Sequence, residues 1–275
     1  MNEMGDLRPI GIFDSGMGGL TVMRALIAKL PQESFVYLGD TARLPYGTKS
    51  ADTVTRYAVQ AARALTARGV KLVVVACNTA SAAALPALQA ALRPTPVLGV
   101  IEPGAEAAVR VADAGPIAVI ATEGTVRGGA YVRAIRALAP AIPVVQQACP
   151  LFVPLAEEGI LEGTIAELAA ERYLAPLFEK NGPRVLVLGC THFPVLAPII
   201  AHVARRYSRH IVLVDSAQTT AESVAHLLGS QGLANGSPSA PQHIFLATDG
   251  PERFARLGEI FLGRKPDPVE LIDLQ

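Results

Sequence analysis

Several residue types are scarce in this chain of 275 residues, and their scarcity narrows the class of protein. Tryptophan is absent and aromatic residues make up 5% of the sequence, which disfavours an aromatic-rich β-sandwich. Alanine, valine and leucine instead carry most of the 51% hydrophobic content, which suits helices packed on parallel strands. Three cysteines in a chain of this length do not make a disulfide framework.

An excess of charge of either sign is also lacking. Lysine plus arginine and aspartate plus glutamate number 24 each, so the chain has no electrostatic footprint for a nucleic acid or a membrane surface. Residues 1–8 lack the basic region and apolar core of a signal peptide. No apolar run reaches the ~18 residues of a membrane span. We therefore expect a soluble, cytoplasmic protein that binds neither nucleic acid nor membrane.

Short apolar runs alternate with helical segments along the whole chain. The strand predicted at 72–75, for example, leads into an alanine-rich helix at 80–92. This alternation predicts an α/β fold with mainly parallel sheets flanked by helices. Because the second half repeats the pattern of the first, we expect two pseudo-symmetric lobes with the active site in the cleft between them. Residues 1–99 with 210–275 would form the first lobe, and residues 100–209 the second.

Two cysteines, Cys77 and Cys190, stand in the same local setting 113 residues apart. Each follows an apolar run that ends in a small residue. The two residues after each cysteine are polar: Asn78, Thr79, Thr191 and His192. In open α/β sheets, ligand-binding groups usually lie where a strand ends and a helix begins. Two thiols in equivalent settings indicate two related chemical roles.

Three other turns also carry candidate site residues. Asp14 begins a glycine-rich turn at 14–19, and such a turn directs backbone N–H groups at an anion. An aspartate beside a buried strand is costly unless it is used or capped. The turn of Pro45, Tyr46 and Gly47 presents an aromatic hydroxyl, with a simple packed turn as the alternative. Thr125 follows a further strand end, where a helix cap is the commoner explanation.

Four alternative roles for the two thiols have to be weighed against proton transfer. A zinc site needs closely spaced ligands, and Cys77 has none beside it. Thiol–disulfide exchange typically uses Cys-X-X-Cys, and a Cys–His hydrolase would leave one strand-end cysteine unexplained. Two unreactive core cysteines would not call for polar neighbours. What remains is a pair in which one thiolate removes a proton from a carbon and the opposite thiol donates one to the other face.

The motifs fall in order along nearly the whole chain. They are Asp14-Ser15-Gly16-Met17-Gly18-Gly19, Pro45-Tyr46-Gly47, Cys77-Asn78-Thr79, Ala121-Thr122-Glu123-Gly124-Thr125 and Gly189-Cys190-Thr191-His192. Together they resemble glutamate racemase, of the aspartate/glutamate racemase family. The resemblance implies an isomerase without a cofactor or metal that interconverts L- and D-glutamate and supplies D-glutamate for peptidoglycan. It also implies a homodimer, and it allows a side activity toward DNA gyrase.

The resemblance further implies roles for individual residues. Cys77 and Cys190 would be the two acid/bases, with Asp14 assisting Cys77 and His192 assisting Cys190. Glu157 would be a further catalytic carboxylate, chosen over the adjacent Glu158 by its spacing from Pro150. The implied substrate contacts are Asp14, Ser15, Tyr46, Gly47, Asn78, Thr79, Thr122, Thr125, Thr191 and His192.

Two alternative functions stay open at this point. The same pair of thiols would serve a racemase of another substrate, such as aspartate or a hydantoin. A non-catalytic amino-acid-binding protein, in which the thiols are incidental, belongs to a different class. The third cysteine, Cys149, lacks the pair of polar neighbours, so we expect it to be structural.

Overall fold

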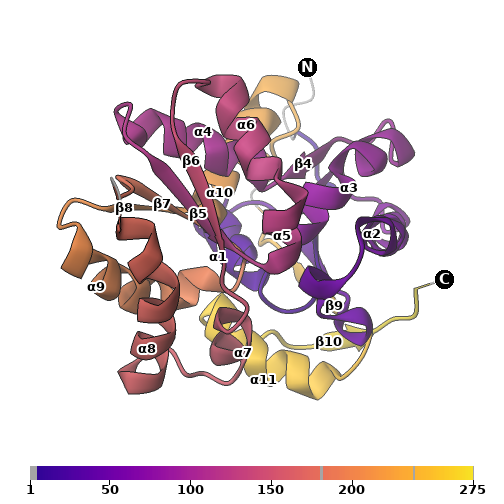
Figure 1. The fold of residues 1–275 in the computed structure, drawn as a ribbon. Helices are drawn as coiled ribbons and strands as arrows, with labels where there is room; N and C mark the ends of the chain where they lie inside the picture. The colour runs from indigo at the N-terminus through magenta and orange to yellow at the C-terminus, as the bar shows by residue number, and fades with distance from the viewer. Residues whose placement is uncertain (1–4, 180–181, 238, 275) are drawn as a thin grey trace.

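The computed structural model describes residues 5–179, 182–237 and 239–274. Strands and helices alternate along the chain and form two sheets of parallel strands (Figure 1). This arrangement confirms the predicted α/β class. We call the six-stranded sheet with its helices the first lobe, and the four-stranded sheet with its helices the second lobe.

The first sheet has the strand order β10-β9-β2-β1-β3-β4. Its strands are β1 (Ile10–Asp14), β2 (Phe35–Gly39), β3 (Leu72–Val75), β4 (Val97–Gly99), β9 (His243–Ala247) and β10 (Val269–Leu271). The second sheet has the order β6-β5-β7-β8. Its strands are β5 (Ile117–Ala121), β6 (Val144–Ala148), β7 (Val185–Gly189) and β8 (Val212–Asp215).

Eleven α-helices are described. They are α1 (Leu20–Lys29), α2 (Ala51–Thr66), α3 (Asn78–Ala91), α4 (Ile101–Ala112), α5 (Glu123–Gly128), α6 (Ala130–Leu138), α7 (Phe152–Glu157), α8 (Gly163–Leu174), α9 (Ala197–Tyr207), α10 (Ser216–Gln231) and α11 (Pro251–Leu262). Short 3₁₀ turns occur at η1 (Thr41–Arg43), η2 (Tyr46–Thr48), η3 (Ala175–Phe178) and η4 (Phe193–Leu196). Helices α5 and α6 are separate because Gly129 adopts φ +62° between them. Among the described residues, none of the helices combines the length and the apolar character that crossing a bilayer requires.

The two sheets are equivalent in how they place the cysteines. Strand β3 ends just before Cys77 and pairs with β1, which ends at Asp14. Strand β7 ends just before Cys190 and pairs with β5, which ends just before Thr122. Because all these strands are parallel, their carboxyl ends lie at one edge of each sheet. Each lobe therefore brings a cysteine and a second polar turn to the same edge.

Strand β8 lies in the second lobe and not in the first, where it was predicted. Residues from 210 onward were expected with the first lobe, but β8 pairs in parallel with β7 of the second sheet. The chain returns to the first sheet only at β9, which pairs with β2 after α10 has been completed. The division of the chain at residues 99 and 210 stays a prediction. The pairing of β8 with β7 differs from it, because residues 212–215 were assigned to the first lobe.

Burial of both sheet faces explains why these strands are so uniformly apolar. In β1, Ile12 belongs to one buried cluster and Phe13 to another, because successive side chains point to opposite faces. The cluster with Ile12 also contains Leu186 of β7 and Val224 of α10, and so spans both lobes. The lobes therefore pack on each other through a shared apolar core.

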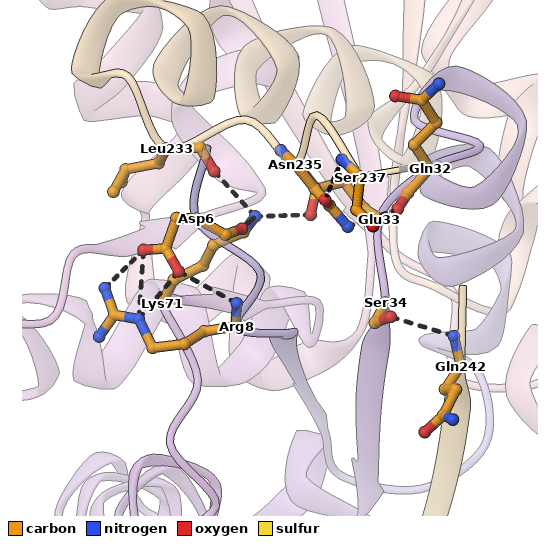
Figure 2. A network of polar contacts seen from close by, with 10 residues as sticks. All are labelled: Asp6, Arg8, Gln32, Glu33, Ser34, Lys71, Leu233, Asn235, Ser237 and Gln242. Carbon is orange, nitrogen blue, oxygen red and sulfur yellow. Dashed lines mark hydrogen bonds and ion pairs between the residues drawn. The ribbon is translucent and has the colours of Figure 1, made fainter. Parts of the chain in front are cut away.

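A buried ion pair fastens the return of the chain to the first lobe (Figure 2). Lys71 precedes β3, and its Nζ lies 2.6 Å from Oε2 of Glu33, which precedes β2. The same ammonium group donates to the carbonyl oxygens of Asp6 at 2.7 Å and Leu233 at 2.8 Å. Glu33 Oε1 accepts from the backbone N–H of Asn235 at 2.8 Å. This network holds the segment after α10 against the amino ends of the strands, opposite the cysteine edge.

Candidate active site

A cavity of about 170 Å³ lies where the carboxyl edges of the two sheets meet. Both lobes contribute to its lining, which comprises Ser15, Gly16, Leu44, Pro45, Tyr46, Gly47, Thr48, Cys77, Asn78, Thr79, Thr122, Glu123, Pro150, Val153, Pro154, Glu157, Cys190, Thr191 and His192. Cavities for drug-sized ligands measure ~300–1,000 Å³, so this one suits a small metabolite. A larger cavity of about 1020 Å³ lies between α3, α4, α6 and α10 and is lined by other residues.

Cys77 lies at the amino end of α3 and is 5% exposed. Its Sγ accepts from the backbone N–H of Ala80 at 3.4 Å and lies 3.5 Å from Oγ of Ser15. Burial, with a smaller contribution from the charge of Asp14, raises the pKa of the Cys77 thiol to about 12, and the contacts with Ser15 and Ala80 oppose this rise. In the unliganded protein near neutral pH, Cys77 is therefore a thiol, the proton-donating form.

Cys190 has a cationic neighbour instead. Its Sγ lies 3.8 Å from Nδ1 of His192, whose Nε2 lies 3.2 Å from Oε1 of Glu157. Burial by itself lowers the pKa of His192, but the hydrogen bonds to Cys190 and Glu157 outweigh it and raise that pKa to about 10. The imidazole is therefore protonated near neutral pH, and its charge stabilises negative charge on the adjacent sulfur. One side of the cavity thus holds a neutral thiol, and on the other side a cation lies beside the sulfur of Cys190.

Asp14 and Thr125 lie behind the cavity wall. Asp14 is fully buried, and its Oδ2 accepts from the backbone N–H of Gly16 at 2.9 Å. The hydroxyl of Thr191 from the second lobe lies 3.5 Å from Oδ1. Burial raises the pKa of Asp14, and the charge of His192 opposes the rise. Asp14 is therefore placed between the two lobes, and its predicted assistance to Cys77 stays a prediction.

A cluster of three threonine hydroxyls joins the lobes on the other side. Thr79 Oγ1 lies 3.0 Å from Oγ1 of Thr122 and 3.2 Å from Oγ1 of Thr125. Thr122 also caps α5 by accepting from the backbone N–H of Thr125. The sequence suggested Thr125 as a helix cap, but the capping side chain is that of Thr122, and Thr125 supplies the N–H group that it binds. Thr79 and Thr122 face the cavity, and Thr125 holds them from behind.

Tyr46 is oriented differently from the sequence-based expectation. The turn was expected to present the phenol, but the hydroxyl donates to Oδ2 of the buried Asp40 at 2.5 Å. Asp40 in turn lies 2.8 Å from Nε of Arg43. The packed-turn alternative therefore describes the hydroxyl, although Tyr46 and Gly47 both line the cavity. Asp40 was missed from the sequence, because a strand-end aspartate is also a common loop residue.

One acceptor of Asn78, a residue that lines the cavity, has no hydrogen-bond partner among the described residues. Its Nδ2 donates to the hydroxyl of Tyr131 at 2.9 Å. Its Oδ1 is buried and accepts no hydrogen bond within the described part of the chain. A buried acceptor without a donor is uncommon in folded proteins, so an N–H group of a ligand would satisfy it. Tyr131 was also missed, since nothing in the pattern of 130–138 distinguishes it from a core residue.

Of the adjacent carboxylates, Glu157 is the one that reaches the cavity. It lines the cavity and contacts His192, as its spacing from Pro150 had favoured. Its second oxygen, Oε2, accepts from Nη2 of Arg253 at 3.1 Å. Arg253 is 96 residues away in the sequence, and no local signal connects it to Glu157. Cys149 is fully buried among apolar residues of the shared core.

The glycine-rich turn at 14–19 packs directly against the second lobe, which gives a first testable prediction. A Cβ on Gly18 would lie 2.6 Å from Oγ1 of Thr191 and would also overlap the His192 ring. Gly18→Ala should therefore lower the free energy of unfolding by about 1–3 kcal/mol, as overpacking does, in urea titrations. The matched control is Gly229→Ala in α10, where a Cβ meets open space. This control should be neutral or stabilising by up to about 1 kcal/mol. Equal effects of the two substitutions would contradict the tight packing of the turn.

A small cavity between two α/β lobes, with one buried thiol on each side, is the arrangement that a racemase acting through two opposed thiols would need. Comparison with known proteins makes the class specific. Residues 10–224 match the family described as Asp/Glu/Hydantoin racemase, and the chain belongs to this family. It is therefore an isomerase.

Individual relatives place the chain more narrowly within that family. It is 50% identical to glutamate racemase of Geobacter metallireducens over 98% of this chain and 97% of the relative. It is 45% identical to glutamate racemase of Neisseria meningitidis over 100% of both chains. Among solved structures, glutamate racemase of Francisella tularensis in complex with D-glutamate superposes with a TM-score of 0.91 at 38% identity, covering 98% of each chain. Aspartate racemase of Picrophilus torridus, at 18% identity and a TM-score of 0.55, shares the fold.

Proposed function

We propose that this chain interconverts L- and D-glutamate, with one of Cys77 and Cys190 removing the proton from Cα and the other donating a proton to its opposite face. The observation that carries the proposal is the pair of buried thiols, one from each lobe, lining one cavity of about 170 Å³. Full-length identity of 45–50% to glutamate racemases supports glutamate as the substrate. The D-glutamate produced serves as a building block for peptidoglycan, the general role of this family.

The proton transfers balance within the cavity. One cysteine acts as a thiolate: the Cα–H bond breaks, an S–H bond forms, and the electron pair stays on Cα and its carboxylate. The opposite thiol then gives its proton to the other face of Cα and becomes a thiolate. Cys77 is a neutral thiol that can donate a proton, and protonated His192 lies 3.8 Å from the sulfur of Cys190, where it would stabilise a thiolate formed during the reaction. The reverse reaction uses the same groups with their roles exchanged.

The polar lining accounts for how an amino acid would be held. The free Oδ1 of Asn78 suits the α-ammonium group. Hydroxyl groups of Thr79 and Thr191 line the cavity, and the amino end of α3 begins there. Backbone N–H groups at a helix amino end attract a carboxylate. These groups, with the predicted contacts Ser15, Gly47 and Thr122, would orient the substrate so that Cα lies between the two sulfurs.

Solvent exchange gives the second testable prediction and separates the candidate functions. The wild-type chain, free of added cofactor and with L-glutamate in deuterated water, should place deuterium at Cα while D-glutamate accumulates to an equal concentration. Proton NMR follows the exchange and polarimetry follows the inversion. L-Aspartate, which is one methylene shorter, should react at least about 10-fold more slowly, the discrimination typical of one methylene. Faster turnover of aspartate would reassign the substrate, and binding of glutamate without exchange would favour an amino-acid-binding protein.

The proposal also includes a cellular location, the cytoplasm, and an oligomeric state, the homodimer. All three cysteines are free and buried, which fits the reducing conditions of the cytoplasm, where precursors of peptidoglycan are made. The resemblance to glutamate racemases supports assembly as a homodimer.

A further inference from the structure

One chain of contacts extends from the Cys190 side of the cavity across to the other lobe. His192 contacts Glu157 at 3.2 Å, and the second oxygen of Glu157 accepts from Arg253 at 3.1 Å. His192 and Glu157 belong to the second lobe. Arg253 lies in the first turn of α11, which belongs to the first lobe. These contacts therefore connect a group beside one thiol to a helix of the opposite lobe.

Helix α11 also touches His192 directly. The ring of Phe261 meets the His192 ring edge-on, with 5.1 Å between ring centroids. His192 is thus held from one side by Phe261 and from another by Glu157, and α11 supports both contacts. In Figure 1, α7 and α11 lie next to each other, and the contact between Glu157 and Arg253 joins them. The orientation of the imidazole consequently depends on how α11 sits against the second lobe.

The stability of the fold gives little reason for the Arg253 contact. The Arg253 side chain is 46% exposed and that of Glu157 is 16% exposed. An ion pair with one exposed partner contributes only about 0–1 kcal/mol. The carboxylate, in contrast, has one oxygen on a buried imidazole, and a charge-assisted bond to its other oxygen restricts its rotation. The effect of Arg253 is therefore expected on geometry at His192.

We propose that Arg253 is a positioning residue for racemisation, which orients Glu157 and, through it, His192 beside Cys190. The inference rests on the proposed function and adds to it a residue from the lobe opposite Cys190. Because the contact joins the two lobes, the placement of the imidazole beside Cys190 depends on residues from both.

The test compares three variants of α11 and is the third prediction. Arg253→Met removes the charge with little loss of volume, Arg253→Lys keeps the charge, and Arg256→Met is the matched control one turn along. Arg256 lines the same adjoining cavity of about 340 Å³ as Glu157 and Arg253. Arg253→Met should lower kcat about 10-fold, by analogy with the smaller losses seen when a residue that orients a metal ligand is removed. KM should change less, Arg253→Lys should recover part of kcat, and Arg256→Met should match the wild type.

Deuterium isotope effects distinguish positioning from a general structural weakening. With substrate deuterated at Cα, slowing the Cys190 step should raise the primary isotope effect on kcat/KM for the enantiomer whose proton Cys190 removes. The effect for the other enantiomer should stay constant or fall, because reprotonation then limits the rate. A variant that merely contains less folded protein would leave both isotope effects unchanged.

Each result decides the proposal. Wild-type kcat in Arg253→Met, an equal loss in Arg256→Met, or unchanged isotope effects for both enantiomers would overturn the positioning role. A wild-type chain that exchanges no deuterium into glutamate would overturn the proposed function itself, and the positioning role with it. The two failures are separate, because the first is read from variants of an active enzyme.

Discussion

Replacing either Cys77 or Cys190 by alanine should lower kcat for glutamate racemisation by about 10²–10⁴-fold, the contribution typical of one acid–base group. Both single variants should lose activity in both directions, since each inversion needs one group to remove a proton and another to return one. The two thiols come from different lobes and line the same cavity.

The fold should survive these substitutions, so the loss can be assigned to chemistry. Removing one sulfur from a cavity wall deletes few contacts, because each of these cysteines already borders empty space. The matched control is Cys149→Ala, which removes the third thiol from the shared core. This control should lose about 1 kcal/mol of stability, as for one deleted core group, and retain its kcat. Circular dichroism and urea titration check the fold of all three variants.

Two results would contradict the two-thiol mechanism. One is near-wild-type turnover by either Cys77→Ala or Cys190→Ala. The other is a loss in Cys149→Ala as large as in the other two, which would indicate that activity follows stability. The double variant gives a further check, because residues that act as a unit are non-additive. Its kcat should lie close to that of the more impaired single variant.

Local sequence pattern predicted which residues line the cavity wherever these residues directly follow a strand end. The sequences around Cys77 and Cys190 each contain an apolar run, a thiol and polar residues, so the strand, the turn and the helix start follow from adjacent residues. The choice of Glu157 over Glu158 also agrees with the contact to His192. The location of both cysteine segments at one cavity followed from the rule that parallel strands present their carboxyl ends at one edge of a sheet.

Local sequence pattern did not predict the contacts between segments that are far apart in the chain. The pairing of β8 with β7 depends on which sheet edge is open, and the composition of 212–215 does not encode that. The Tyr46 hydroxyl turned to Asp40 because a buried aspartate needs a donor, which spacing alone does not reveal. Arg253 meets Glu157 only after both lobes have folded and packed. Each of these features is set by tertiary packing, where local pattern has least information.

The second large effect is expected at Lys71, on the face of the first lobe opposite the cavity. Lys71→Met should lower the free energy of unfolding by about 3–5 kcal/mol, because it leaves the carboxylate of Glu33 buried without its counter-charge. The side chains of Lys71 and Glu33 are 0% and 4% exposed, and 2.6 Å separates their charged atoms. The substitution also removes the donor for the carbonyl oxygens of Asp6 and Leu233. Urea titration with two spectroscopic probes measures the loss.

The matched control for a lost ion pair is Arg68→Met. Arg68 pairs with Glu270 at 2.5 Å, but their side chains are 34% and 52% exposed. Removing this pair should cost no more than about 1 kcal/mol. Burial therefore distinguishes the two substitutions, since each deletes one cation from one close ion pair.

A second variant keeps the test decisive if Lys71→Met fails to fold. In the double variant Lys71→Met with Glu33→Gln, the buried group is neutral, and its amide oxygen still accepts from the backbone N–H of Asn235. We therefore expect the double variant to recover more than half of the stability lost by Lys71→Met. The network fastens the segment by which the chain returns from the second lobe to the first (Figure 2). Unfolding free energies of Lys71→Met and Arg68→Met that agree within about 0.5 kcal/mol would show that the return segment is held by other contacts.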